Sequence, residues 1–292
     1  HTPVILQGAG VQGRIAGGIL GYYGRDSEDA GLALNYVTLQ TEISAADNAY
    51  FAGGILGRYY RNIDGSAEES AYDVIGHINI EKAVRASYFA GGVVGFAHGS
   101  NLRIADVKIT GNVTNEFAGG NYADCRGAGG VIGLLSGRYV EIRNAQISAG
   151  FHQNTYATGG VIGAVGKIKS SFNEQRKSIV KIDGAKVTSS FGCESATTAR
   201  CRGGLLGVVY PGSMVALDGT IDVSGMSLTQ TLQRFGRTGY IAGFQEEALI
   251  YLEETAVYER PAKAWKDDIG NYGGLYKNGA WGEDGKTLIS YE

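Results

Sequence analysis

One five-residue motif, Gly-Gly-apolar-apolar-Gly, occurs six times in this chain and constrains the fold more than any other feature. Successive copies start 36, 38, 38, 30 and 44 residues apart. A motif that recurs about every 20–50 residues indicates a repeat architecture, in which each unit buries its apolar face against its neighbours. The copies of this Gly-Gly motif are Gly17-Gly18-Ile19-Leu20-Gly21, Gly53-Gly54-Ile55-Leu56-Gly57, Gly91-Gly92-Val93-Val94-Gly95, Gly129-Gly130-Val131-Ile132-Gly133, Gly159-Gly160-Val161-Ile162-Gly163 and Gly203-Gly204-Leu205-Leu206-Gly207.

A second pattern follows most copies after a short turn. Its apolar residues are spaced by two, three and two positions, as in Leu102, Ile104, Val107 and Ile109. A spacing of two places side chains on one face of a strand. A step of three inserts one residue, which bends the chain while the apolar face stays inward. We expect a corner at this step, which is occupied in later copies by Asn144, Asp183-Gly184 and Asp218-Gly219.

The two patterns together predict an all-β fold. We expect a β-solenoid, similar to a parallel β-helix, with about seven to eight irregular repeats of roughly 36 residues. It should span residues 1–258, and residues 259–292 should form a capping or interaction segment. Decayed copies of the motif occur at Gly239-Tyr240-Ile241-Ala242-Gly243 and Tyr272-Gly273-Gly274-Leu275-Tyr276. We expect each copy of the motif to be a stacking strand whose paired glycines lie in register, because a Cβ would crowd the adjacent coil. These glycines are Gly17, Gly18, Gly53, Gly54, Gly91, Gly92, Gly129, Gly130, Gly159, Gly160, Gly203 and Gly204.

The repeat resembles a known family. The motif Gly91-Gly92-Val93-Val94-Gly95, followed by the strand pattern Ile104-Ala105-Asp106-Val107, is similar to the GLUG motif. The resemblance covers roughly residues 13–258. GLUG repeats occur in bacterial and archaeal surface and secreted proteins, including adhesins and the non-catalytic parts of some secreted peptidases. The resemblance therefore implies an extracellular β-solenoid, and it supplies no catalytic residues.

Composition excludes several other classes. A net charge of −3 argues against the basic footprint of a nucleic-acid-binding protein. No run of 18 apolar residues occurs, so we expect no membrane span. The segment 8–13 matches the G-x-G-x-x-G pattern, but the residues after it are a poor helix, which dinucleotide binding requires. The four histidines are scattered, so we expect no metal and no cofactor.

Cysteine usage leaves more than one pairing open. Cys193 and Cys201 flank a seven-residue segment and could bridge a loop, which would leave Cys125 free or bonded to another chain. A bridge between Cys125 and Cys201 is the main alternative, because each precedes an arginine and then a glycine-rich repeat. Three ordinary buried thiols are a further alternative.

Aromatic and arginine residues flank the motifs, mostly in the N-terminal third. We assign Tyr22, Tyr59 and Phe96 to one repeat offset, so that their rings would stack as a ladder. Such a ladder belongs either to the core or to a rigid surface that contacts sugars or a partner subunit. The residues considered for that interface are Tyr22, Tyr23, Tyr59 and Tyr60, with Arg25, Arg58, Arg61, Arg126, Arg138 and Arg202 beside them.

Three functions compete. The first is a non-catalytic extracellular structural protein, a self-assembling subunit of a cell-surface sheath, layer or filament whose main partner is itself. The second is an adhesin or glycan-binding module that contacts a cell-surface glycan or protein. The third is a polysaccharide-active β-helix enzyme with carboxylates on one face. Acidic candidates for the enzyme are Asp26, Glu28, Asp29, Asp106 and Asp222. No acid recurs with a basic partner, so we expect no enzyme.

Overall fold

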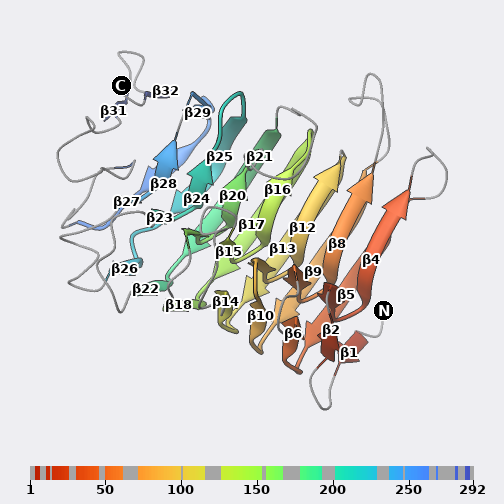
Figure 1. Cartoon of the computed structure of the whole chain (residues 1–292). Helices are drawn as coiled ribbons and strands as arrows, with labels where there is room; N and C mark the ends of the chain where they lie inside the picture. Colours follow the sequence, from red (N-terminus) through yellow and green to blue (C-terminus); the bar gives the residue numbers. More distant parts are fainter. Residues whose placement is uncertain are drawn as a thin grey trace.

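The fold of this chain is built from β-strands. The computed structural model describes residues 4–6, 11–13, 15–25, 31–45, 50–61, 72–99, 101–115, 126–152, 156–166, 178–192, 201–228, 237–245, 247–262, 268, 280–281 and 287–289. Within these ranges no residue is helical, so no helix there could cross a membrane. The strands follow one another as parallel coils along one axis (Figure 1). The predicted all-β solenoid is therefore confirmed.

Within the described residues the coils build five sheets. Sheet A contains β1 (Val4–Leu6), β5 (Ala33–Leu39), β9 (Asp73–Ile80), β13 (Leu102–Ile109), β17 (Val140–Ile147), β21 (Ile179–Val187), β25 (Met214–Asp222), β29 (Leu249–Leu252), β30 (Val257–Glu259), β31 (Ala280–Trp281) and β32 (Thr287–Ile289). Sheet B contains β2 (Val11–Gly13), β6 (Ile43–Ala45), β10 (Val84–Ala86) and β14 (Val113–Asn115). Sheet E contains β18 (Gly150–His152), β22 (Ser190–Gly192) and β26 (Ser227–Leu228).

Two further sheets have seven strands each. Sheet C contains β3 (Ile15–Gly17), β7 (Phe51–Gly53), β11 (Phe89–Gly91), β15 (Gly127–Gly129), β19 (Ala157–Gly159), β23 (Cys201–Gly203) and β27 (Arg237–Gly239). Sheet D contains β4 (Leu20–Arg25), β8 (Leu56–Arg61), β12 (Val94–Gly99), β16 (Ile132–Ser136), β20 (Ile162–Val165), β24 (Leu206–Val209) and β28 (Ala242–Gln245). The number of repeats differs slightly from the seven to eight irregular repeats predicted. One face of the solenoid is divided between sheets B and E.

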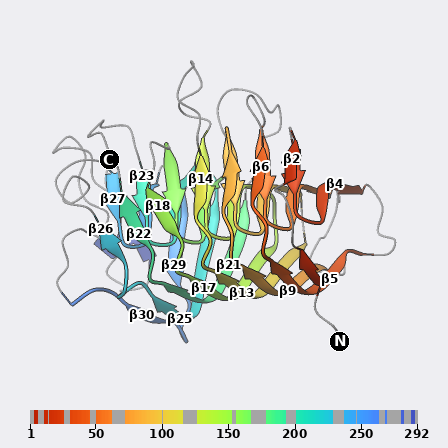
Figure 2. The ribbon, with the colours of Figure 1, turned by 90° about the horizontal axis from the view of Figure 1, so that it is seen from below.

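Each coil visits the sheets in a fixed order. It passes from sheet B or E to sheet C, bends into sheet D and returns through sheet A, as β10, β11, β12 and β13 do. In Figure 2, strands β5, β9, β13 and β17 follow one side of the molecule, and β2, β6, β14 and β18 follow the other. Residues of the inner strands of sheet A therefore pair with residues in the coils before and after them, as those of β13 do with β9 and β17.

The Gly-Gly motif forms the bend between sheets C and D, whereas we expected a single stacking strand. In the third copy, β11 ends at Gly91 and β12 begins at Val94. The predicted stacking in register is observed, since Gly91 pairs with Gly53 and with Gly129. A Cβ on Gly92 would overlap the carbonyl oxygen of Gly130 in the next coil. The decayed copy at 239–243 makes the seventh bend, between β27 and β28, and the one at 272–276 lies outside the described residues.

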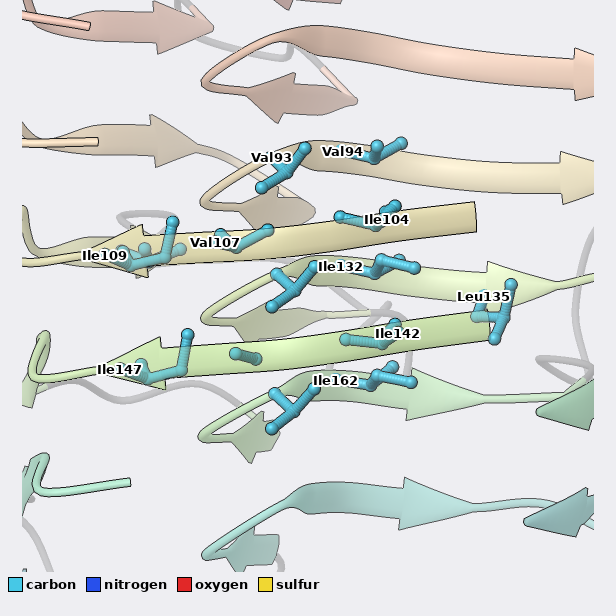
Figure 3. Close-up of a cluster of buried hydrophobic side chains, with 14 of the residues drawn as sticks. Val93, Val94, Ile104, Val107, Ile109, Ile132, Leu135, Ile142, Ile147 and Ile162 are labelled. Carbon is cyan, nitrogen blue, oxygen red and sulfur yellow. The ribbon is translucent and has the colours of Figure 1, made fainter. Parts of the chain in front are cut away.

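The interior is filled by apolar side chains from both sides of this bend and from sheet A. Val93 and Val131 stack in successive bends and are fully buried. Ile104 and Ile142 face them from sheet A and pair in register. Figure 3 shows Val93, Ile104 and Ile142 among the buried apolar side chains on the strands of the two layers. Fully burying one such side chain contributes about 1.5–3 kcal/mol, so the repeated column is the main stabilising feature.

The step of three in the strand pattern is a bulge inside one continuous strand, and not a corner between two strands. The inserted residue adopts a left-handed backbone in every coil from β5 to β25. The residues in this column are Tyr36 (φ 60°), His77 (φ 54°), Asp106 (φ 53°), Asn144 (φ 51°), Gly184 (φ 78°) and Gly219 (φ 61°). The last coil departs from the pattern, because Val257 is 54% exposed and Tyr258 pairs with the buried Ile221 instead.

The two ends of the solenoid differ within the described residues. At the C-terminal end, β32 pairs antiparallel with β29. The carbonyl of Asp268 accepts backbone hydrogen bonds from Ile241 and Ala242, each 2.9 Å long. At the other end, β3 and β4 each have a described neighbour on one side only. The capping role expected for 259–292 stays a prediction, although these contacts agree with it.

Candidate functional site

A groove crosses the outer face of sheet A and combines aromatic and charged side chains. Its volume is about 330 Å³. It is lined by Tyr72, Arg103, Tyr139, Val140, Glu141, Arg143, Ile179, Val180, Lys181, Met214, Ala216, Tyr251 and Glu253. These residues come from six successive coils, which the parallel register of sheet A brings side by side.

Strand alternation explains why these side chains face outward. Ile104, Ile142 and Ile182 point into the core and stack on one another. The residues one position earlier pair in the same register but point to the opposite face. They are Arg103, Glu141 and Lys181, so opposite charges alternate along the solenoid axis.

Glu141 is the central acid of the groove. Arg103 donates from Nε to Glu141 Oε2 over 2.7 Å, and Arg143 donates from Nε to Oε1 over 2.6 Å. The Glu141 side chain is only 10% exposed. Its burial by itself would raise its pKa, but the two guanidinium hydrogen bonds outweigh that effect and hold the pKa below its ordinary value. Glu141 is therefore a fixed carboxylate with both oxygens engaged.

A second ion pair follows one coil later. Lys181 Nζ lies 2.8 Å from Asp218 Oδ2, and Thr255 donates a 2.6 Å hydrogen bond to Oδ1 of the same carboxylate. The hydrogen bond from Lys181, and then those from Thr255 and the Gly219 amide, lower the pKa of Asp218 to about 2. The hydrogen bond to Asp218 also raises the pKa of Lys181. Both groups therefore stay charged at neutral pH.

Three half-buried tyrosines surround this charged floor. Arg103 lies under the Tyr72 ring, with its guanidinium carbon 4.5 Å from the ring centre. Tyr251 stands at the other end, on β29. Burial is the largest cause that raises the pKa of Tyr72 and of Tyr251, so both hydroxyls remain protonated donors. Aromatic rings that hold an apolar face and a polar tip suit amphipathic ligands.

Tyr139 has a strained backbone. Its φ is 55°, a left-handed value that costs a bulky residue free energy. The preceding coil places Asn101, a residue that tolerates this conformation, at the same position with φ 58°. Strained residues of this kind collect at binding and catalytic sites.

A second hollow, with a volume of about 580 Å³, adjoins the groove. The two share Ile179 and Met214 as lining residues. The second hollow adds the exposed Arg138 and Leu249, the latter 41% exposed. The depression on this face therefore extends toward the starts of the strands of sheet A.

The structure corrects the predicted aromatic ladder. Tyr59 pairs with Tyr23 and Ala97, whereas the residue aligned with Tyr22 and Phe96 is Arg58. Tyr59 is fully buried and cannot contact a ligand, whereas Tyr22 is 53% exposed. The Arg58 guanidinium lies between the rings of Tyr22 and Phe96, 5.7 and 5.4 Å from their centres. Tyr23 and Tyr60 are half-buried.

Several predicted arginines are also internal. Arg61 and Arg202 are buried to 1% and 0% exposure, and Arg126 is buried as well. They do not form a surface interface with the tyrosines. Arg138 is exposed in the second hollow, and the side chain of Arg25 lies outside the described residues.

The cysteine pairing remains a prediction. Cys201 is fully buried at the start of β23. Cys125 and Cys193 lie outside the described residues, so neither proposed bridge is tested.

Of the acidic residues considered for an enzyme, the structure describes Asp106 and Asp222, and each has its own separate partners. Asp106 lies 3.4 Å from His77 Nδ1 and accepts a 2.9 Å hydrogen bond from Asn144. Asp222 pairs with Lys186 at 2.8 Å. Asp26, Glu28 and Asp29 lie outside the described residues. Across the part of the chain that the structure describes, no three His, Cys, Asp or Glu side chains are placed to hold a metal ion.

The groove itself was not predicted. Its sequence signal is the polar residue between the first two apolar positions of each strand pattern, which is Arg103, Glu141 and Lys181 in successive coils. Tyr72 and Tyr139 each directly precede a strand, at the position that Asn101 occupies in the coil between them. Comparison of the chain with protein-family models, with curated proteins and with solved structures finds no match, so the function must be argued from the site.

Proposed function

We propose that this chain is a non-catalytic β-solenoid module of a secreted or cell-surface protein and that it binds glycan through the groove on sheet A. The observation that carries the proposal is the charged floor of Arg103, Glu141 and Lys181 bordered by Tyr72 and Tyr251. Tyrosine rings pack against the apolar faces of sugars, and the charged groups bond to their hydroxyls.

The rigidity of the floor supports binding. Glu141 is held by two arginines, and Lys181 is held by Asp218, so the polar groups are already ordered before a ligand arrives. Preorganised polar groups lose little conformational entropy on binding. The groove is also built on sheet A and not on long loops, which fixes the spacing of its contacts.

The ion pairs of Glu141 and Asp218 favour binding of a glycan over its hydrolysis. A glycosidase needs one carboxyl group with a raised pKa as general acid. In the groove, hydrogen bonds lower the pKa of Glu141 and of the neighbouring Asp218. The extracellular location rests on the GLUG resemblance of the repeat.

A glycan array followed by calorimetry on the most strongly bound glycan tests the proposal. We expect the variants Tyr72→Ala and Tyr251→Ala to weaken binding at least tenfold while leaving the melting temperature near that of the wild type. Tyr22→Ala is the matched control, because Tyr22 is an exposed tyrosine on sheet D, away from the groove. The proposal fails if no glycan binds, or if Tyr22→Ala removes binding and the groove variants do not.

Self-assembly is the second candidate, and the N-terminal end supports it. Among the described strands, β3 and β4 pair on one side only, and such edges accept a further strand. Sedimentation and electron microscopy of the purified chain test this function. Filaments or dimers that Ile15→Lys abolishes would support it, and a particle that stays monomeric at high concentration would overturn it.

A further inference from the structure

We infer that the groove selects a neutral, hydroxyl-rich glycan chain over one that carries carboxylates or sulfates, and that the glycan lies along the solenoid axis. The inference rests on the proposed function and adds the ligand's charge and direction. Both follow from how the charged residues of the floor are paired and from where its tyrosines stand.

The cations of the groove are already neutralised. Arg103 and Arg143 share Glu141, and Arg143 also lies 4.0 Å from Asp183. Lys181 is engaged by Asp218 at 2.8 Å. An anionic sugar would have to displace one of these carboxylates, and the displaced carboxylate would then lose its partner at a cost.

Around the groove the acids outnumber the bases. Three cations line the groove, whereas four acids either line it or pair with those cations. These are Arg103, Arg143 and Lys181 against Glu141, Asp183, Asp218 and Glu253. A sulfated or uronate-bearing chain would meet repulsion here. A neutral hydroxyl can both accept from a guanidinium and donate to a carboxylate, which matches alternating donors and acceptors.

The positions of the aromatic residues set the direction. Tyr72 lies next to the first residue of β9, and Tyr251 lies on β29. Five steps between neighbouring strands separate β9 from β29 in sheet A, which corresponds to roughly 24 Å at the usual strand spacing. A ligand that touches both rings must therefore be an oligosaccharide that crosses the strands. A single sugar would contact only one of them.

Tyr139 is the residue that this arrangement assigns to ligand contact between the two ends. It lines the groove with a strained backbone, although asparagine serves the aligned position in the previous coil. The substitution Tyr139→Asn therefore removes the ring and relieves the strain together. A purely structural tyrosine would behave in the opposite way when replaced.

Calorimetry with defined oligosaccharides tests the inference. The probes are neutral gluco-, xylo- and manno-oligosaccharides as disaccharides and hexasaccharides, with oligogalacturonate and heparin oligosaccharides as the acidic set. We expect neutral hexasaccharides to bind at least tenfold more tightly than the disaccharides, with less than about twofold change in affinity between low and high salt. Preference for the acidic set, with affinity that falls steeply with salt, overturns the inference and leaves the proposed function standing. No binding by either set overturns both.

Two variants test which residues cause the charge selectivity and the ligand contact. Glu141→Gln leaves Arg103 and Arg143 without their shared carboxylate, so we expect affinity for the acidic set to rise several-fold. Asp106→Asn, on the same face of sheet A but outside the groove, is the control and should change neither set. Tyr139→Asn should lower affinity for the neutral hexasaccharide about tenfold without lowering the melting temperature. Unchanged selectivity in Glu141→Gln, or lost stability with unchanged binding in Tyr139→Asn, contradicts the assignment.

Discussion

The hydroxyl of Tyr59 donates a 2.8 Å hydrogen bond to Asp73 Oδ2 inside the apolar core. The same carboxylate lies 3.7 Å from Arg61 Nη1, and its other oxygen accepts a 2.6 Å bond from the Leu32 amide. Burial and the neighbouring carboxylate raise the pKa of Tyr59, so it remains a donor. The next coil has Leu102 in the position of Asp73, so one coil replaces an apolar contact with a buried polar cluster.

This cluster predicts that the effects of Arg61 and Asp73 on the stability of the protein depend strongly on each other. Asp73→Leu should destabilise the protein by about 3–5 kcal/mol, because Arg61 would remain buried without its carboxylate. The double variant Arg61→Met/Asp73→Leu should recover much of that loss, since both charges are removed together. Urea unfolding of the single and double variants measures the difference. Equal unfolding free energies for the two would show that the ion pair does not couple these residues.

The glycine bend gives a second prediction. Gly92→Ala should cost about 3 kcal/mol, because the new Cβ would overlap the Gly130 carbonyl, and this backbone is fixed by hydrogen bonds between coils. Gly76→Ala is the matched control on sheet A. Its Cβ would meet only the end of the exposed Asn35 side chain, and the aligned Ala105 already carries a Cβ. Thermal unfolding should separate the two variants by many degrees, and a similar loss in both would contradict this account of the bend.

The bulge column gives a third prediction. Asn144 has a φ of 51°, and the next coil places Gly184 in the same column. Asn144→Gly should therefore change the stability by less than about 0.5 kcal/mol, whereas Asn144→Val should cost about 1–2 kcal/mol for the left-handed backbone. Chemical denaturation of both variants measures this difference. Equal stabilities would mean that the backbone can leave the left-handed region at little cost.

Much of the fold was predictable because its signals are local. The spacing of Ile104, Val107 and Ile109 follows from strand alternation and one inserted residue, so both the inward face and the inserted residue could be read from the chain, although a corner was expected there and not a bulge. The bend at the Gly-Gly motif was mistaken for a strand. Stacking of Gly91 on Gly129 requires glycine whether the motif forms a strand or a bend. The steric crowding was therefore inferred correctly, but it does not distinguish a strand from a bend.

The groove could not be predicted for a physical reason. Tyr72, Arg103, Glu141 and Lys181 lie in different coils, and they meet only once the exact register between coils is known. The repeats are 30 to 44 residues long, and connecting segments of unequal length hide that register in the sequence. A one-residue error in alignment also misplaced Tyr59, which stacks with Tyr23 in the core and not with Tyr22 on the surface.

The Lys181–Asp218 pair predicts acid sensitivity of the groove face. The pKa of Asp218 is lowered from 3.8 to about 2. The pairing of Asp218 therefore makes its full contribution to the stability of the folded protein at pH values above the ordinary pKa of this carboxyl group. That contribution is lost as the pH falls from about 4 to 2, because the unfolded chain takes up the proton first. Asp218→Asn should lower the melting temperature at neutral pH and flatten its decline across this interval. Melting curves of both proteins measure the effect, and an unchanged decline in Asp218→Asn would show that other carboxylates cause the acid loss.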